Sequence, residues 1–225
     1  MNRKETTASN ATTNVTTKVL AQMGLFSALI ILMAMVPFLG YIPLGFTRAT
    51  IIHIPVIIGS LMLGPKKGAA LGAVFGLTSL INNTINPTLT SFVFTPFYSV
   101  GDISGGWQSL VICFVPRILI GVVPFYVYRL IAKANKDKTK PSVVGLALAG
   151  LAGALTNTLL VMNMIYLFFG NSYAAVREVA ADAIYAVILG VITVNGIPEA
   201  IVAAIIVALA GKVLMNKNVM KNIGV

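Results

Sequence analysis

The sequence contains several apolar stretches of about 20 residues or more with hardly any charge, which is the length a helix needs to cross a bilayer. Of the 225 residues, 57% are hydrophobic and only 10% are charged, whereas about 25% of the residues in a soluble domain are charged. The apolar residues run continuously rather than alternating with polar ones, so the sequence does not fit an outer-membrane β-barrel. It predicts a helical membrane protein.

We expect an all-α membrane protein, a bundle of six transmembrane helices at residues 18–38, 49–64, 67–83, 108–132, 142–169 and 183–214. The second and third helices are short. Pro65 ends the second helix, and the two helices are joined in a tight hairpin at Gly64-Pro65-Lys66-Lys67-Gly68. Residues 18–214 thus form one transmembrane domain. We expect residues 1–17 to be a disordered cytoplasmic lead and residues 215–225 a cytoplasmic tail.

The basic residues are distributed unevenly over this topology. Arg48 and Arg177 fall on one side of the membrane and Arg117 lies inside the fourth span, whereas the other Lys and Arg residues fall on the opposite side. By the positive-inside rule that side is cytoplasmic, and both termini lie on it. The net charge of +10 therefore reflects membrane topology, and we do not expect the chain to bind nucleic acid.

Residue types that carry catalysis or bind metals are scarce. The chain has one histidine, His53, and one cysteine, Cys113, and no serine lies in a Gly-x-Ser-x-Gly context, so neither a hydrolase site nor a metal site can be assembled. The segment 59–64 begins like a phosphate-binding loop, but Pro65 stands where that loop needs a lysine. We expect no catalytic residues, no metal and no cofactor, and any ATP must be hydrolysed by another subunit.

The outward connections are longer and more polar than the cytoplasmic ones. The segment 84–107 is too long for a plain connector and carries aromatic residues, prolines and hydrogen-bonding side chains, so we expect it to fold as a cap over a site. Arg117 needs a partner, because a buried guanidinium costs several kcal/mol when it is unpaired. A polar, anionic small molecule would supply that partner.

The predicted outward-facing ligand pocket is built from side chains that donate hydrogen bonds. The candidates are Arg117, Arg48, Asn83, Asn86, Asn157, Tyr98, Asn163 and Arg177. Structural alternatives exist: Arg117 could bind carbonyl groups freed at Pro116, Arg48 could anchor the chain at the membrane interface, and the asparagines could link helices. The individual residues therefore stay open, while together they describe a polar pocket.

Small residues recur at every fourth position in three of the predicted helices, which lets helices approach closely in a membrane. These stripes are Gly68, Gly72 and Gly76; Gly145, Ala149 and Gly153; and Ala200, Ala204 and Ala208. We expect them to pack the bundle internally. Gly24 and Ala28 form a shorter stripe near the cytoplasmic end of the first helix, where a partner helix could bind.

Two other classes of transport protein remain as alternatives. A proton-coupled, self-sufficient secondary carrier needs a titratable carboxylate near the middle of the membrane, and Asp182 and Glu199 are the candidates. Such carriers usually show inverted repeats, whereas the two halves of this chain differ in span lengths and loop sizes. A channel of the aquaporin type needs two Asn-Pro corners, and only Asn86-Pro87-Thr88 is present.

The segments 43–55, 64–68 and 75–79 resemble the substrate-binding S components of energy-coupling factor (ECF) vitamin transporters. The resemblance extends to the six-helix layout and the polar lead, which is nearly the whole chain. Within that family, the run 82–88 and the step Pro116-Arg117 look most like the pantothenate-type members.

This resemblance implies an S component in the bacterial cell membrane that binds a vitamin from outside with high affinity. It also implies docking on a transmembrane coupling subunit powered by two cytoplasmic ATPases. Family members dock through an Ala-x-x-x-Ala pattern on the first helix, which Gly24 and Ala28 match apart from the first glycine. Pantothenate fits the predicted pocket, with a carboxylate for an arginine and with hydroxyls and an amide for asparagines and a tyrosine. Riboflavin, biotin and folate remain alternatives.

Overall fold

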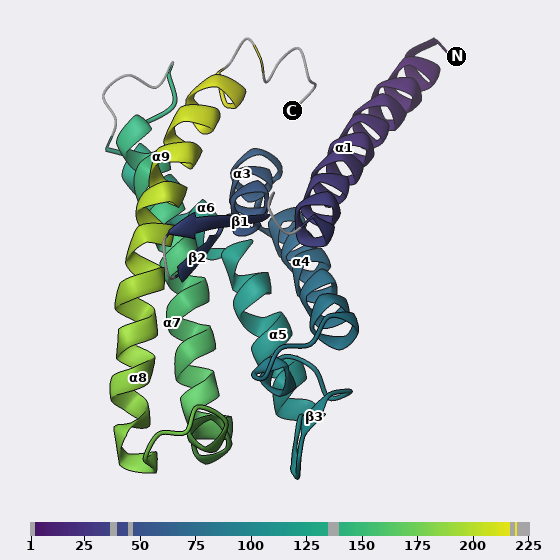
Figure 1. Ribbon diagram of the computed structural model, residues 1–225. Helices are drawn as coiled ribbons and strands as arrows, with labels where there is room; N and C mark the ends of the chain where they lie inside the picture. Colours follow the sequence, from purple (N-terminus) through teal and green to yellow (C-terminus); the bar gives the residue numbers. More distant parts are fainter. Residues whose placement is uncertain (1–2, 37–39, 45–46, 135–139, 217–218, 220–225) are drawn as a thin grey trace.

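A computed structural model describes residues 3–36, 40–44, 47–134, 140–216 and 219 of the chain, with side chains for residues 17–36, 40, 50–134, 140–216 and 219. The structure is mainly helical (Figure 1). Its helices are α1 (Arg3–Met35), α3 (His53–Leu63), α4 (Pro65–Ile85), α5 (Trp107–Ile120), α6 (Val123–Ala132), α7 (Val143–Val176), α8 (Ile184–Val191) and α9 (Ile197–Leu214), with short turns η1 (Ser91–Val93) and η2 (Ala181–Ala183) and the π-helix η3 (Ile192–Gly196).

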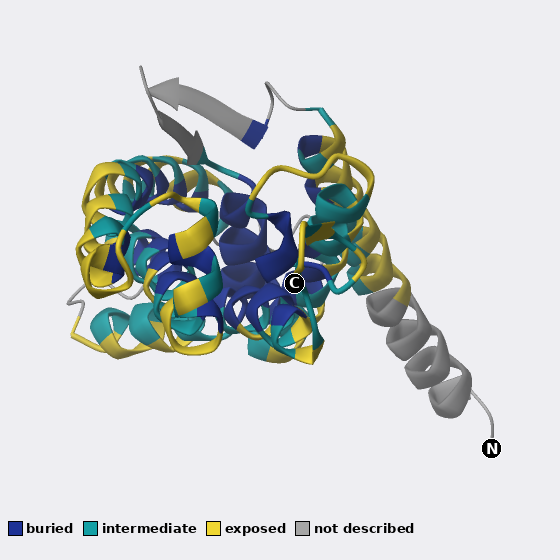
Figure 2. Ribbon diagram, turned by 60° about the horizontal axis from the view of Figure 1, so that its bottom comes forward, coloured by how far each residue is buried: buried dark blue, intermediate teal, exposed yellow. Residues whose placement is uncertain are grey.

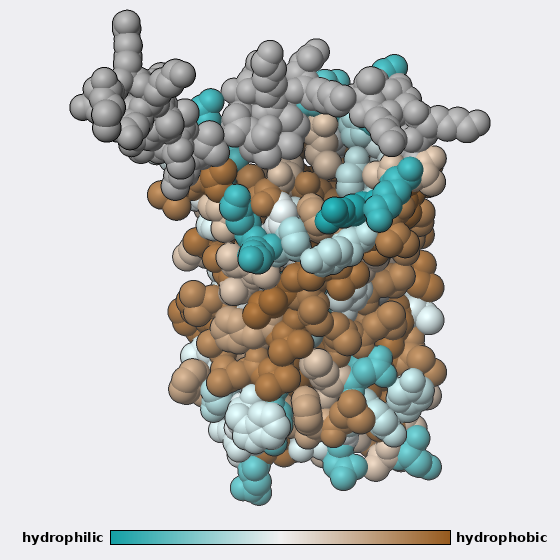
Figure 3. Space-filling view, turned by 180° about the vertical axis from the view of Figure 1, so that it is seen from behind, coloured by the Kyte–Doolittle hydropathy of each residue, from teal (hydrophilic) through white to brown (hydrophobic). Residues whose placement is uncertain are grey.

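Five helical segments of the described chain are long and apolar enough to cross a membrane. They are Thr17–Met35, Pro65–Ile85, Trp107–Ala132, Val143–Val176 and Ala181–Leu214. One face of the molecule shows a broad apolar band with polar residues toward both ends (Figure 3). The prediction of a helical membrane bundle is therefore confirmed for these five segments, and their bounds lie close to the predicted ones.

The predicted helix at 49–64 is present but starts later, as α3 at His53–Leu63, because a hairpin that was not predicted ends at Thr50. Strands β1 (Tyr41–Leu44) and β2 (Thr47–Thr50) pair in antiparallel register, with Tyr41 opposite Thr50. Only then does α3 begin, and its 11 residues cover about 16 Å, roughly half of the hydrocarbon thickness. Threonine and isoleucine favour extended backbone, and Pro43 cannot continue a helix. The fold is therefore mainly helical rather than all-α; a second small hairpin joins β3 (Ser99–Val100) to β4 (Ile103–Ser104).

The short helix α3 forms the centre of the bundle. Every one of its residues is buried, and it contacts α1, α4, α6, α7 and α9, so the buried part of the molecule gathers around it (Figure 2). A second apolar cluster, which includes Phe92, Phe169 and Tyr173, lies where the segment after α4 meets α7 and α8. The N-terminal end of α1 and the C-terminal end of α9 lie at the same end of the bundle (Figure 1). The lead that was predicted to be disordered has helical backbone from Arg3 onward, continuous with the rest of α1. The predicted domain boundaries stay predictions.

Close approach of α4 and α5 depends on the first small-residue stripe. A side-chain carbon added at Gly68 would meet the carbonyl oxygen of Gly121, and one added at Gly72 would meet that of Arg117. Cys113 lies buried in the same interface and donates from its Sγ to the carbonyl oxygen of Gly76, 3.2 Å away. These small residues pack the bundle internally, as the sequence predicted.

The position of Gly72 leads to a first prediction. Gly72→Ala should push α4 away from the backbone of Arg117, and overpacking of this kind costs about 1–3 kcal/mol. We expect a lower midpoint of thermal unfolding in detergent. Gly24→Ala is the matched control, because nothing lies within 4 Å of a carbon added at Gly24 and alanine is the better helix former. Equal midpoints for the two variants would contradict the close contact.

Candidate functional site

A polar cavity of about 300 Å³ lies between the C-terminal half of α4, the end of α1, β2, α5 and α7. Its described lining residues come from six separate parts of the chain. They are Ala34, Thr50, Ile52, Phe75, Thr78, Ser79, Asn82, Asn83, Asn86, Thr88, Phe94, Arg117 and Asn157. Among these lining residues Arg117 is the only charged one, so the cavity combines one positive charge with amide and hydroxyl groups.

Arg117 owes its position to the proline before it. Pro116 has no N–H, so the carbonyl group of Ile112 four residues earlier receives no helix hydrogen bond from it. Arg117 Nη1 donates to this carbonyl oxygen at 2.8 Å. The guanidinium carbon also lies 5.1 Å from the ring centre of Phe94 and 5.7 Å from that of Phe75, within the range of cation–π attraction. Arg117 is thus both bound to a freed carbonyl, as one alternative predicted, and placed at the cavity.

Helix α4 contributes a polar stripe to the cavity. Thr78, Ser79, Asn82, Asn83 and Asn86 line it, and their spacing of three or four residues places them on one face of a helix. The predicted site residues include Asn83 and Asn86 but not the other three. Four residues before Asn83 is Ser79, and four and eight residues before Asn86 are Asn82 and Thr78, so the helical spacing identifies all three.

The segment after α4 is folded, as the cap prediction required. Ser91 is fully buried; its Oγ donates to Asn83 Oδ1 at 2.8 Å and accepts from the Thr88 backbone N–H at 2.9 Å. Phe92 packs edge-on against Phe169 of α7, with ring centres 5.7 Å apart. Thr88 from this segment lines the cavity. The cap is therefore tied to both α4 and α7.

Asn157 closes the cavity on the α7 side. Its Oδ1 atom is buried and makes no hydrogen bond among the described residues. A buried amide oxygen without a donor is unfavourable by about 1–3 kcal/mol. A ligand hydroxyl or amide N–H in the cavity would satisfy it.

Three other predicted site residues, Asn163, Tyr98 and Arg177, do not line this cavity. Asn163 is bonded through Nδ2 to the Leu159 carbonyl oxygen at 2.7 Å, and Tyr98 packs against the second apolar cluster. Arg177 lies at the end of α7, bonded to the Tyr173 hydroxyl at 3.1 Å, beside a separate surface cleft that shares only Thr88 with the cavity. The side chain of Arg48 lies outside the described residues.

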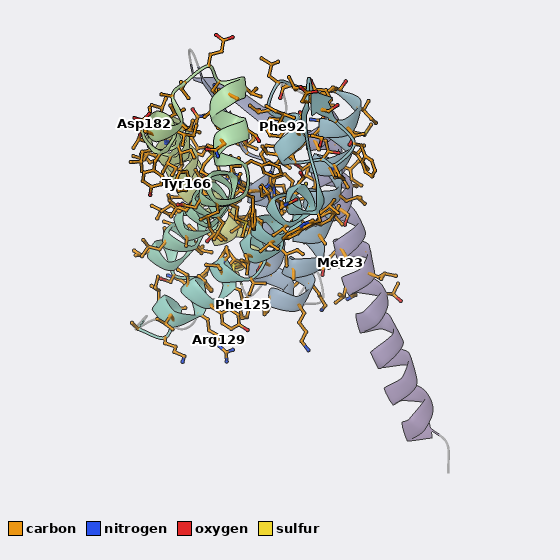
Figure 4. The ribbon with its side chains drawn as sticks, turned by 90° about the horizontal axis from the view of Figure 1, so that it is seen from below. Met23, Phe92, Phe125, Arg129, Tyr166 and Asp182 are labelled. Atoms are coloured by element: carbon orange, nitrogen blue, oxygen red, sulfur yellow. The ribbon has the colours of Figure 1, made fainter. Side chains whose placement is uncertain are left out.

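The two carboxylates considered for proton coupling also lie outside the cavity lining. Asp182 is exposed at η2, and in the view from below it lies with Tyr166 on the side of the bundle away from Met23 of α1 (Figure 4). Glu199 is buried and accepts a hydrogen bond from the backbone of Thr50. The cavity thus offers a binding surface for a polar anion and no proton-accepting carboxylate of its own among its described lining residues.

Comparison with known proteins agrees with this geometry. The family model for the substrate-specific component of ECF transporters matches residues 18–211, which is most of the chain. The chain belongs to this family. Its members are substrate-binding transport subunits rather than enzymes. With five helices able to cross a membrane and with bacterial relatives, the chain is a multi-pass protein of the bacterial cell membrane.

Two relatives are named for a substrate. The pantothenic acid transporter PanT of Lactococcus lactis subsp. cremoris is 43% identical over 164 residues, which covers 70% of this chain and 79% of the relative. The pantothenate transporter PanT of Leuconostoc mesenteroides subsp. mesenteroides is 29% identical over 206 residues, covering 90% and 94% of the two chains.

The hydrogen bonds of the cap lead to a second prediction. Ser91→Ala removes the bonds to Asn83 and Thr88, and losing buried hydrogen bonds costs about 1–3 kcal/mol. We expect chymotrypsin to cut the cap near the exposed Phe97 roughly tenfold faster, because local opening becomes easier. Ser104→Ala, at an exposed serine of the same segment, is the control. Equal cleavage rates would show that these bonds do not hold the cap.

Proposed function

We propose that this S component binds pantothenate in the cavity around Arg117. The observation that carries this proposal is the position of Arg117, the one charged side chain among the described lining residues. Apart from Ala34 and Ile52, the other described lining residues carry amides, hydroxyls or aromatic rings. The names of the two relatives support the choice of vitamin. A volume of about 300 Å³ is at the small end of the range for small-molecule sites, which suits a compact vitamin.

The chemistry of pantothenate matches the polar groups around the cavity. Its carboxylate pairs with Arg117, and charge-assisted bonds of this kind are shorter and stronger than neutral ones. Its hydroxyls and amide face Asn157 and the polar stripe of α4. Among the described lining residues only Phe75 and Phe94 are aromatic, and both rings lie against Arg117, so a stacked flavin or pterin ring fits less well.

In the membrane, the chain has six crossings, both termini in the cytoplasm and the cavity facing outward. The ends of α1 and α9 lie on one side of the bundle (Figure 1), which requires an even number of crossings. Five long segments are present in the described chain, and the hairpin with α3 supplies the sixth. The basic residues of the sequence place the termini on the cytoplasmic side.

The chain works together with a transmembrane coupling subunit and two ATPase subunits, which drive uptake. The face of α1 around Gly24 and Ala28 serves as the docking surface. Both residues are exposed, and the neighbouring side chains Leu20 and Leu25 are 71% and 70% exposed. The internal stripes on α4 and α7, in contrast, are covered by their own bundle.

A binding screen of the purified chain tests the choice of ligand. Pantothenate should bind more tightly than riboflavin, biotin or folate, measured by calorimetry in detergent. Tight binding of one of the other vitamins would overturn the assignment. Uptake into liposomes that contain this chain alone, without ATPase subunits, would favour the secondary carrier.

The third prediction concerns the charge of Arg117. Arg117→Ala should weaken pantothenate binding by about 2–5 kcal/mol, the cost of leaving a buried charge without its partner. Arg117→Lys should weaken it measurably as well, because lysine keeps the charge but loses the planar pair of donors. Calorimetric titration of the three proteins checks both values.

The neutral alcohol analogue of pantothenate separates pairing from a structural role of Arg117. It should bind poorly to the native chain and lose little further affinity in Arg117→Ala. Arg177→Ala is the matched control, since this arginine lies outside the cavity, and it should keep native affinity for the acid. If acid and alcohol suffer equally from Arg117→Ala, the residue supports the cavity wall and the carboxylate binds elsewhere.

The fourth prediction concerns docking. Gly24→Trp should leave pantothenate binding unchanged, because the added side chain points into open space in the isolated chain. It should abolish uptake by the assembled transporter, since a bulky residue prevents close helix approach. Binding and ATP-driven uptake are measured on the same variant. Loss of binding would show that this face packs against the chain's own bundle.

A further inference from the structure

Glu199 is a buried carboxylate that the binding site, as described so far, does not use. Its side chain is 8% exposed, and it is the only buried acidic side chain in the part of the chain whose burial is described. It lies in the first turn of α9, directly after the π-helix η3. A carboxylate inside a membrane bundle is expensive and marks a functional position.

The partner of this carboxylate is the backbone of the β1–β2 hairpin. The N–H of Thr50 donates to Glu199 Oε1 at 2.7 Å, across 149 positions of sequence. Strand β2 also contacts η3 and α9, and the hairpin lies beside them in Figure 1. Thr50 itself lines the cavity. The hydrogen bond therefore joins the last transmembrane segment to a wall of the cavity.

The hairpin depends on such outside support. It has two strands of four residues, and an isolated two-stranded hairpin is at best marginally stable. At its base, Thr50 pairs with Tyr41, and the Ile51 N–H donates to the Gly40 carbonyl oxygen at 3.0 Å. The bond from Thr50 to Glu199 fastens this base to a transmembrane helix.

We propose that Glu199 is a positioning residue for the cavity: it holds Thr50 and the base of the hairpin against α9 and thereby keeps a bound ligand enclosed on this side. It acts through Thr50 and does not touch the ligand. That the ligand is pantothenate rests on the proposed function, whereas the hydrogen bond between Thr50 and Glu199 does not depend on it. Because a bound ligand leaves when a wall opens, losing this bond raises the dissociation rate of pantothenate more than it lowers the association rate.

Two substitutions at Glu199 separate the hydrogen bond from the charge. Glu199→Gln keeps a side-chain carbonyl oxygen that accepts from Thr50, and Glu199→Ala removes it. Val207→Ala is the matched control: Val207 is fully buried in the same helix, so it reports general destabilisation of α9. In stopped-flow measurements with pantothenate, Glu199→Ala should raise the dissociation rate roughly tenfold, the scale of one buried hydrogen bond. Glu199→Gln should largely restore the native rate, and Val207→Ala should leave it near native.

A second measurement needs no ligand. A maleimide labels Ile51→Cys, a partly buried position directly after the hairpin, and the buried Cys113 gives the slow background, measured in the chain without Ile51→Cys. Labelling should be faster when Glu199→Ala is added and near the starting rate with Glu199→Gln. This readout reports the base of the hairpin and not the stability of the bundle.

Three outcomes would overturn the proposal. Native dissociation and labelling rates in Glu199→Ala would show that the bond holds nothing. Equal impairment in Glu199→Gln and Glu199→Ala would assign the effect to the charge rather than to the bond with Thr50. The same impairment in Val207→Ala would assign it to helix packing. Failure of the native chain to bind pantothenate would refute the proposed function alone, because the labelling comparison still decides the role of Glu199.

Discussion

The site depends on placing one permanent positive charge inside an apolar helical bundle. Pro116 leaves the carbonyl group of Ile112 without its helix donor, and the guanidinium of Arg117 binds it. Gly72 allows α4 to touch the backbone of Arg117, which brings the polar stripe of α4 to the same place. One proline and one glycine thus fix both the charge and the amides around it.

The helical part of the fold could be predicted from the sequence because long apolar runs have one interpretation in a membrane. The segments Pro65–Ile85 and Trp107–Ala132 differ from the predicted 67–83 and 108–132 by only one or two residues. The run 49–64 was predicted as a helix and is helical from His53 to Leu63. The strands before it were missed, because four residues give too short a pattern to separate a strand from other structure. The contacts of β2 with η3 and α9 cannot be seen in the sequence.

The candidate site was predictable in part, and helix geometry explains the difference. Arg117, Asn83, Asn86 and Asn157 line the cavity, as polar residues in apolar spans were expected to do. Asn163 is six residues beyond Asn157, which is about 240° around a helix, so its side chain faces another direction. It donates to the carbonyl oxygen of Leu159 in the same helix. Glu199 was considered only for proton coupling, because its partner is a backbone N–H in a hairpin that was not predicted from the sequence.

The two proposed tasks of the chain, holding a vitamin and docking on a coupling subunit, use different parts of α1. Ala34 near its end lines the cavity, whereas Gly24 lies ten residues earlier, about 15 Å along the helix axis. Between them α1 packs on α3 and α4, and no single side chain reaches from one region to the other. A partner docked at Gly24, as proposed, would lie outside the cavity, and a shift of α1 against α4, whose inner face carries the polar stripe, is a route by which such docking would act on a ligand.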